Sequence, residues 1–453
     1  MHLLKGCKQL FSKILIANRG EIAVRIIRAC KEMGISTVAV FSEADRTALH
    51  VSLADESFCI GPPAVKDSYL NMTAILSAAV ASGAQAIHPG YGLLSENAKF
   101  AALCSQCNIK FIGPPASVIA KMGDKNEARK TMIAAGVPVI PGCEMVRNIE
   151  EAKTEAEKIG YPLLIKARAG GGGRGIRLVE NADALENAFN TASAEALSAF
   201  GDGGMYIEKF LSPVKHIEMQ LLGDEEGNVV CLGERECSLQ RKNQKLLEES
   251  PSPAVTPALR RAMTASAKKA AKAAGYVNAG TIEFLLDSEN NYYFMEMNTR
   301  LQVEHPVTEM VTGIDLVQWQ IRIAAGQPLG FTQEDITING HAIECRINAE
   351  NVRENFRPCC GKIKLLHIPG GPWVRFDTAI YQDYFIPPYY DSMIGKLIVH
   401  AKTREEAIRK MQASLCELVI EGIDHNSELQ MELLSDEKVK SGNYCTNFMA
   451  ERG

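Results

Sequence analysis

The stretch GTIEFLLDSENNYYFMEMNTRLQVEHP, residues 280–306, decides how the rest of the chain is interpreted. It holds an apolar and β-branched run at 281–287, a polar turn at 288–291, and an aromatic and apolar run at 292–297. Two such runs joined by a short polar turn are typical of a β-hairpin, so we expect two antiparallel strands here.

Acidic side chains face one another across this hairpin. Pairing Asp287 with Tyr292 sets a register in which Glu283 falls directly opposite Glu296. Side chains alternate along a strand, so Asn298 shares the face of Glu296. Opposed carboxylates repel unless a cation lies between them, and Mg²⁺ takes such ligands when it also holds substrate phosphates. The hairpin therefore indicates a metal site; the alternative is an edge hairpin with solvated acids.

A glycine run at residues 169–175, AGGGGRG, separates two strand-like runs. Consecutive glycines cost backbone entropy, so packing does not explain them. They suit a mobile hairpin whose backbone N–H groups approach phosphate oxygens, and Lys166 just before them adds a point charge for phosphate. No GK[ST] closes the run, so it is not a Walker A loop.

Composition limits the classes of function. A chain of 453 residues predicts two to four domains, and no apolar run reaches the roughly 18 residues of a membrane span. The net charge of −5, with signs mixed, argues against a nucleic-acid partner. The 13 cysteines are scattered, which favours reduced thiols in a cytoplasm-like compartment, and Cys104 and Cys107 are interpreted as helix residues.

The N-terminal part alternates strands and helices. Strands at 13–18 and 37–41 flank a helix at 21–33, and this βαβ unit predicts a parallel sheet. The crossover turn reads NRGE rather than GxGxxG, so NAD is not expected. The loop HPGYGLLSEN, residues 88–97, either lines a ligand site at the strand ends or is a simple turn.

Later segments change character. Strands at 205–211, 216–222 and 229–232 suggest antiparallel pairing. The charged segment 234–251 is either a solvated loop or, because leucines anchor it, a segment with some charges held inward.

Four further segments complete the secondary-structure prediction. We expect one helix over 117–136, a strand at 137–141, a helix at 313–325, and a surface loop at 389–396. Short strands and a helix after residue 341 predict an α+β closing domain.

These parts together suggest ATP-dependent transfer to an anionic acceptor. Lysines, a divalent metal and arginines are the groups that phosphoryl transfer needs, since it is catalysed by positioning and charge neutralisation. Glu304 is the best candidate for a general base if its loop converges with Arg300 and Lys245.

Long motifs along the chain resemble those of the biotin carboxylase family, from about Lys13 to Phe448. They are KILIANRGEIAVRIIRAC (13–30), AIHPGYGLLSEN (86–97), KARAGGGGRGIR (166–177), ECSLQRKNQK (236–245), EMNTRLQVEHPVTE (296–309), ECRINAE (344–350) and PPYYDSMIGK (387–396). The chain ends where the standalone subunit of acetyl-CoA carboxylase ends, and no AMKM biotinyl-lysine motif follows. The family resemblance therefore suggests that subunit.

The resemblance implies an α/β and α+β multidomain fold. We expect a Rossmann-like N-terminal domain at 1–121, an ATP-grasp domain at 122–332 with a mobile lid at about 138–211, and an α+β C-terminal domain at 338–449.

The resemblance also assigns residues to each ligand. Nucleotide-binding positions would be Lys166, Gly172, Gly173, Glu208, Lys209, Phe210, Leu211, His216, Gln240, Asn243, Glu283 and Glu296. Glu283, Glu296 and Asn298 would hold Mg²⁺ or Mn²⁺. Bicarbonate would contact Lys245, Arg300, Gln302, Val303 and Arg346, while biotin would contact Arg346 and Tyr91. The catalytic set would be Arg300, Glu304, Lys245 and Arg346, with Glu304 as the base and Arg346 stabilising an enolate-like oxygen of biotin.

Partners and departures complete the expectation. The resemblance implies a homodimer, a biotin carboxyl carrier protein, carboxyltransferase subunits and a cytoplasmic role in fatty acid synthesis, with no nucleic-acid or membrane partner. Pro115 replaces a nucleotide-contacting Lys, Asn243 replaces a His, and Ala169 replaces one glycine of the run. Another ATP-grasp ligase and a catalytically silent copy are the alternatives, and the intact acids and arginines argue against the silent copy.

Overall fold

The computed structural model describes residues 10–143, 145–167, 176–200 and 203–452. The N-terminal region is a parallel five-stranded sheet in the order β3-β2-β1-β4-β5. This is the strand order of a Rossmann-like sheet, and it confirms the parallel sheet that the sequence predicted. Its elements are β1 (Lys13–Ile16), α1 (Gly20–Glu32), β2 (Ser36–Ser42), α2 (Leu49–Leu53), β3 (Glu56–Gly61), α3 (Met72–Ser82), β4 (Ala86–His88), α4 (Ala98–Gln106) and β5 (Lys110–Phe111).

The single helix expected over 117–136 is two helices, α5 (Ala116–Gly123) and α6 (Lys125–Ala134). The break falls at Asp124, whose backbone is extended and whose carboxylate accepts hydrogen bonds from the backbone N–H groups of Asn126 and Glu127. Asp is a strong N-cap, so this side chain ends one helix by starting another.

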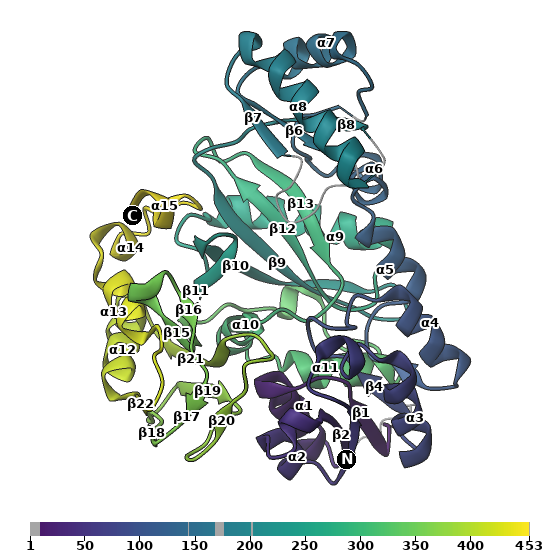
Figure 1. Cartoon of the computed structure of the whole chain (residues 1–453), viewed down its shortest axis with the longest axis vertical. Coiled ribbons are helices and arrows are strands. Elements are labelled where there is room, and N and C mark those ends of the chain that lie inside the picture. The colour runs from purple at the N-terminus through teal and green to yellow at the C-terminus, as the bar shows by residue number, and fades with distance from the viewer. Residues whose placement is uncertain (1–9, 144, 168–175, 201–202, 453) are drawn as a thin grey trace.

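A small unit follows, built on the three-stranded sheet β7-β6-β8, and we call it the lid (Figure 1). It consists of α7 (Ile149–Ile159), β6 (Leu163–Ala167), β7 (Ile176–Val179), α8 (Ala182–Phe200) and β8 (Met205–Lys209). The expected strand at 137–141 is wrong: in the described chain it forms only an isolated bridge between Val139 and Phe294. Gly172 and Gly173 lie outside the described residues.

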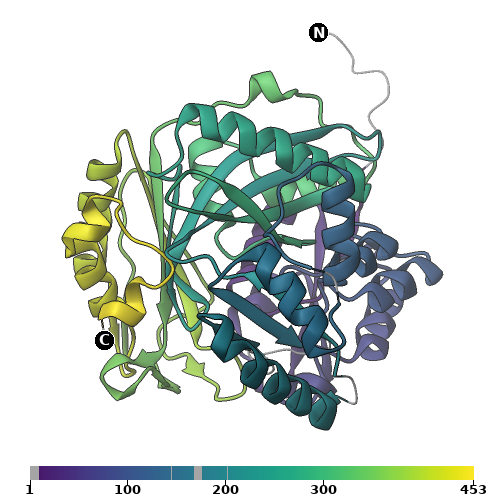
Figure 2. The same ribbon diagram turned by 90° about the horizontal axis from the view of Figure 1, so that it is seen from above.

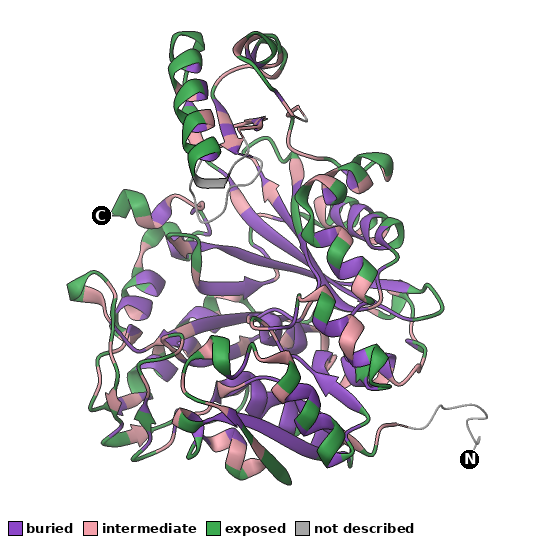
Figure 3. Cartoon of the chain, turned by 45° about the vertical axis from the view of Figure 1, so that its right-hand side comes forward, coloured by how far each residue is buried: buried purple, intermediate pink, exposed green. Residues whose placement is uncertain are grey.

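One antiparallel sheet of eight strands dominates the rest, in the order β13-β12-β9-β10-β11-β14-β21-β19. Its strands are β9 (Lys215–Gly223), β10 (Val229–Arg241), β11 (Gln244–Ser250), β12 (Asn278–Leu286), β13 (Tyr292–Asn298), β14 (His341–Asn348), β19 (Val374–Thr378) and β21 (Met393–Ala401). Because β11 pairs with β14, the sheet runs without interruption from the central region into the C-terminal region. The strands are mostly buried on both faces (Figure 3).

Two segments that the sequence allowed as loops are wholly or partly strand. Residues 234–251 form the β10–β11 hairpin, so the solvated-loop alternative is wrong and the alternative with charges held inward is confirmed; buried Glu234, for example, pairs with Arg260 at 2.5 Å. The segment 389–396 is a loop only in its first half, since Met393 to Lys396 begin β21.

Helices cover the large sheet. They are α9 (Pro257–Ala274), α10 (His305–Thr312), α11 (Leu316–Ala324), α12 (Arg404–Glu417), α13 (Ser427–Ser435), α14 (Glu437–Lys440) and α15 (Phe448–Arg452). The helix expected at 313–325 begins later, at Leu316, because Gly313 ends α10 at a φ of 73°. Minor strands are β15 (Glu350–Asn351), β16 (Arg357–Pro358), β17 (Gly361–Lys362), β18 (Leu365–His367), β20 (Phe385–Ile386) and β22 (Val419–Glu421).

The N-terminal region and the C-terminal helices lie on opposite sides of the molecule, with the large sheet between them (Figure 2). None of the helices in the described part of the chain is both long and apolar enough to cross a membrane.

Candidate active site

The β12–β13 hairpin places Glu283 opposite Glu296, as the sequence predicted, although the register at the turn differs. Leu286, rather than Asp287, pairs with Tyr292, and an irregularity just after Glu283 shifts the pairing by one residue. A β-bulge adds one residue to one strand, so it restores the opposition of the two acids.

The two acids have different surroundings. Glu283 is buried, accepts a hydrogen bond from Asn298 Nδ2 at 2.6 Å, and lies 2.9 Å from His216 Nε2. Burial alone would raise its pKa, but the charges of Lys245 and His216 hold the pKa of Glu283 well below its usual range. Glu296 keeps exposed surface, but partial burial of its carboxylate and the charge of Glu283 raise its pKa. A divalent cation would relieve this repulsion, so two carboxylates beside an amide fit Mg²⁺.

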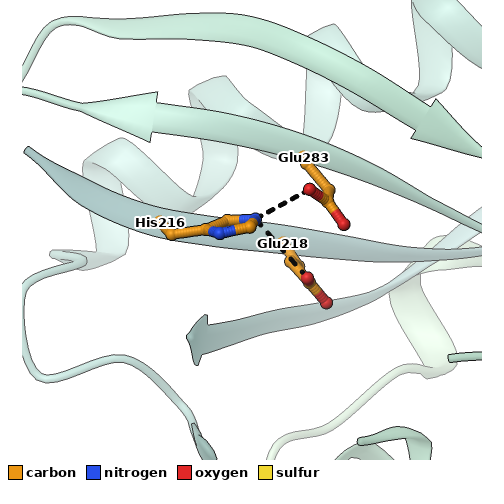
Figure 4. Close-up of side chains that lie close together, drawn as sticks. All are labelled: His216, Glu218 and Glu283. Carbon is orange, nitrogen blue, oxygen red and sulfur yellow. Dashed lines mark ion pairs between the residues drawn. The ribbon is translucent and has the colours of Figure 1, made fainter. Parts of the chain in front are cut away.

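His216 stands between two carboxylates, those of Glu218 and Glu283 (Figure 4). Its Nε2 lies 2.9 Å from Glu283 and 3.5 Å from Glu218, while Nδ1 meets the Gln240 amide at 2.8 Å. Burial would lower the pKa of His216, but the Glu283 charge raises it overall. The two acids therefore favour the protonated form of His216 in this arrangement.

Lys245 lies at the centre of the charged cluster. Its Nζ is 2.5 Å from Glu304 and 3.7 Å from Glu283, and it also pairs with Glu218. Burial would lower the pKa of Lys245, but Glu218 and Glu304 raise it well above its usual value. The convergence that the sequence could only assume is thus present.

Glu304, at the start of α10, is fully buried between two cations. Arg346 Nη2 donates to its second oxygen at 2.9 Å, and Arg346 Nε donates to Glu248 at 2.6 Å. Burial and Glu218 would raise the pKa of Glu304, but Lys245 and Arg346 lower it overall. Glu304 is therefore ionised at neutral pH, the form that accepts a proton.

Arg300 is held by a residue from the N-terminal region. Its Nε donates to Glu96 at 2.8 Å and its Nη1 donates to Gln302 at 2.7 Å. Glu96 also accepts the backbone N–H of Thr299 at 3.0 Å. Through Glu96, the loop 88–97 contacts the candidate site, which favours the ligand-site alternative over a simple turn.

The nucleotide positions predicted in the lid form contacts within it. Lys166 pairs with Glu208 on the neighbouring strand β8. Lys209 donates to the Tyr161 carbonyl at 2.8 Å. Phe210 and Leu211 follow the end of β8 at Lys209, and Asn243 occupies the β10–β11 turn at a φ of 64°.

Several buried charged residues were missed from the sequence. They are Glu21, Glu218, Arg235, Glu248, Glu344 and Lys396, and the exposed Glu96 was missed as well. Alternation in HIEMQ, which puts His216 and Glu218 on one face, was an available signal for one of them. For Arg235, which bonds Glu218 at 3.0 Å across to β9, the pairing partner comes from another strand.

The comparisons with known proteins agree along the whole chain. Family models described as "Biotin carboxylase, N-terminal domain", "Carbamoyl-phosphate synthase L chain, ATP binding domain" and "Biotin carboxylase C-terminal domain" match residues 10–119, 124–332 and 344–451. Biotin carboxylase 1 of Bacillus subtilis (strain 168) is 57% identical over 442 residues, which cover 97% of this chain and 98% of that protein. The chain belongs to the biotin carboxylase family. It is therefore an ATP-grasp ligase, as its motifs predicted.

Solved biotin carboxylase structures share the fold. The biotin carboxylase–β-γ-ATP complex from Campylobacter jejuni has a TM-score of 0.92 at 50% identity and covers 97% of this chain and 99% of that one. The biotin carboxylase domain dimer of the Hydrogenobacter thermophilus 2-oxoglutarate carboxylase, with MgADP, ADP and bicarbonate, has a TM-score of 0.90 at 50% identity, covering 98% of each chain. The three-part architecture is that of the family.

Proposed function

We propose that this chain uses ATP and bicarbonate to carboxylate biotin held by a biotin carboxyl carrier protein. The observation that supports it most is the buried Glu304 carboxylate, 2.5 Å from Lys245 and 2.9 Å from Arg346, beside the hairpin acids. A base flanked by cations suits an anionic substrate whose proton must be removed.

ATP would lie between the lid and the hairpin, held by the nucleotide positions predicted above. Glu283, Glu296 and Asn298 would hold Mg²⁺, or Mn²⁺ in its place, and the metal would neutralise phosphate charge. The H. thermophilus neighbour, whose structure contains MgADP and bicarbonate, supports this pairing of ligands.

Bicarbonate would lie against Lys245, Arg300, Gln302 and the Val303 backbone. Glu304 takes the bicarbonate proton, and the freed oxygen attacks the γ-phosphorus of ATP to give carboxyphosphate and ADP. The cations hold the substrate's negative charge beside the phosphate, where it would otherwise be repelled.

Biotin then receives the carboxyl group. Carboxyphosphate breaks its C–O bond to give CO₂ and phosphate, and the phosphate takes the proton of the biotin ureido nitrogen. That nitrogen attacks CO₂, while Arg346 stabilises the negative ureido oxygen and Tyr91 lines the biotin pocket.

The carrier and acceptor belong to the wider assembly. We infer that the chain is the subunit of a cytoplasmic acetyl-CoA carboxylase, works with carboxyltransferase subunits towards malonyl-CoA and fatty acid synthesis, and is a homodimer. The H. thermophilus neighbour, a biotin carboxylase domain dimer, supports the homodimer, and its origin in a 2-oxoglutarate carboxylase makes another acceptor the second candidate.

The deciding experiment is ATP hydrolysis with Mg²⁺ and free biotin, with and without bicarbonate. ADP release that needs both bicarbonate and biotin for its full rate is the expected result. Release indifferent to bicarbonate would point to another ATP-grasp acceptor. An absence of turnover despite nucleotide binding would favour a silent copy.

A further inference from the structure

Three sequence motifs that the proposed chemistry leaves without a full role meet at one point. The turn NRGE supplies Glu21, the loop HPGYG supplies Tyr91, and the segment MIGK supplies Lys396. They come from the N-terminal region and from β21 of the large sheet. Their convergence behind Glu304 needs an explanation beyond packing.

Lys396 is the centre of this group and has no exposed surface. Its Nζ lies 3.1 Å from Glu21 and donates to the Val303 carbonyl at 2.8 Å. Tyr91 donates its hydroxyl to Glu21, and its ring centroid is 5.9 Å from the ammonium. One side chain thus ties two regions of the fold to the residue before the base.

The buried ammonium keeps its charge. Burial would lower the pKa of Lys396, but Glu21, Glu344 and Asp377 raise it overall. An unpaired buried ammonium would be costly, and the surrounding acids offset that cost. A charged donor makes a stronger hydrogen bond to a carbonyl than a neutral donor does.

The position of the Val303 carbonyl affects the position of the base, Glu304. It shares a planar peptide with the N–H of Glu304, so fixing the carbonyl also fixes the start of the Glu304 backbone. Arg346, which binds the Glu304 carboxylate, stands directly opposite Lys396 in the β14–β21 register. Neighbouring strands therefore hold the backbone and the side chain of the same residue.

We propose that Lys396 is a positioning residue for bicarbonate activation, holding the Val303–Glu304 peptide so that the Glu304 carboxylate faces the bound bicarbonate. This inference rests on the proposed function. A misplacement of about 1 Å is enough to lower a rate roughly 100-fold, so this contact is a sensitive one.

The test compares Lys396→Met with the double variant Lys396→Met/Glu21→Gln. The double variant also removes the acid that the single change leaves unpaired, so it limits any loss of folding stability. Lys402→Met, at an exposed lysine just after β21, is the matched control. Each protein is measured for kcat and KM in bicarbonate-dependent ATP hydrolysis, MgADP affinity, Tm, and amide hydrogen exchange over residues 301–308.

Both Lys396 variants should lower kcat/KM for bicarbonate by about 10- to 100-fold with unchanged MgADP affinity, and should speed exchange at 301–308. If both the Tm and the kcat/KM of the double variant returned to wild-type values, Lys396 would have a merely structural role and the proposal would be overturned. Unchanged exchange would also overturn it. A wild type whose turnover ignores bicarbonate would reject the proposed function, while the exchange still decides whether Lys396 fixes the peptide.

Discussion

Lys245 Nζ and Glu304 Oε1 lie 2.5 Å apart, although Lys245 lies on β11 and Glu304 lies at the start of α10. The same ammonium pairs with Glu218. Lys245 therefore offsets the charge of the buried Glu218 and also lies beside the base, Glu304. The same ammonium stabilises the fold and takes part in the candidate site.

Replacing Lys245 with Gln should lower bicarbonate-dependent ATP turnover by about 100-fold, because the substrate loses a cation and the base loses its partner. Breaking a buried pair costs up to about 3–5 kcal/mol, so Tm should fall as well. Steady-state kinetics and thermal melts measure both effects. Lys242→Gln, at the exposed β10–β11 turn, is the control, and equal kinetics in the two variants would contradict the prediction.

Changing Glu96 to Gln should raise KM for bicarbonate roughly tenfold with a smaller effect on MgADP affinity, because Arg300 loses a charge-assisted hydrogen bond. Glu225→Gln removes an exposed ion pair with Lys110 and is the matched control. Bicarbonate titrations of ATP hydrolysis measure the effect. An unchanged KM would mean that Arg300 needs no support from the N-terminal region.

Glu296→Lys should abolish metal-dependent turnover, since it places a cation where Mg²⁺ is expected. Calorimetry of ADP binding with and without Mg²⁺ provides a second readout: the variant should lose the gain in affinity that Mg²⁺ gives. Glu289→Lys, in the exposed turn of the same hairpin, should keep that gain. Wild-type turnover in Glu296→Lys would refute the hairpin metal site.

Arg346→Ala should reduce biotin carboxylation by about 100-fold, which is the usual effect of removing one hydrogen-bond donor to a developing oxyanion. It should reduce biotin-independent ATP hydrolysis less. The hydrolysis should still fall somewhat, because Arg346 also holds Glu304 at 2.9 Å. Parallel assays of ADP release and carboxybiotin measure the two losses. Equal losses would reject a separate role towards biotin.

Glu248 should make stability depend on pH. Burial and the charge of Glu304 outweigh Arg346 and raise the pKa of Glu248 to about 7, from 4.5. Between these values the folded protein binds more protons at this site than the unfolded chain, so its contribution to stability falls as pH rises from 4.5 to 7 and is constant above.

Glu248→Gln keeps an acceptor for Arg346 and removes this titration. The Tm of the variant relative to wild type should therefore increase from pH 5 to pH 7 and then level off. Thermal melts across that range measure the difference in Tm between the variant and wild type. The other titrating groups are common to both proteins, so their contributions cancel in this difference. A difference that stays flat from pH 5 to pH 8 would show that Glu248 is ionised throughout.

Much of the fold followed from local pattern. The parallel sheet came from βαβ alternation, and the helix expected at 21–33 is α1 (Gly20–Glu32). An error arose where polarity was taken as a sign of exposure: 393–396, expected in a surface loop, begins the buried strand β21. Such charges are tolerated inside only when partners from elsewhere in the chain meet them.

The sequence by itself determined the hairpin with opposed Glu283 and Glu296 and, through its motifs, the family. Strand alternation is a local property that residue spacing predicts, but the opposition of the two acids also depends on an irregularity just after Glu283 that spacing did not predict. Only the tertiary structure decided that Glu96 holds Arg300 and that Lys396 holds the Val303 carbonyl. These contacts join residues far apart in sequence, and the cost of burying a charge such as that of Lys396 is offset only where the fold brings a partner within hydrogen-bonding distance.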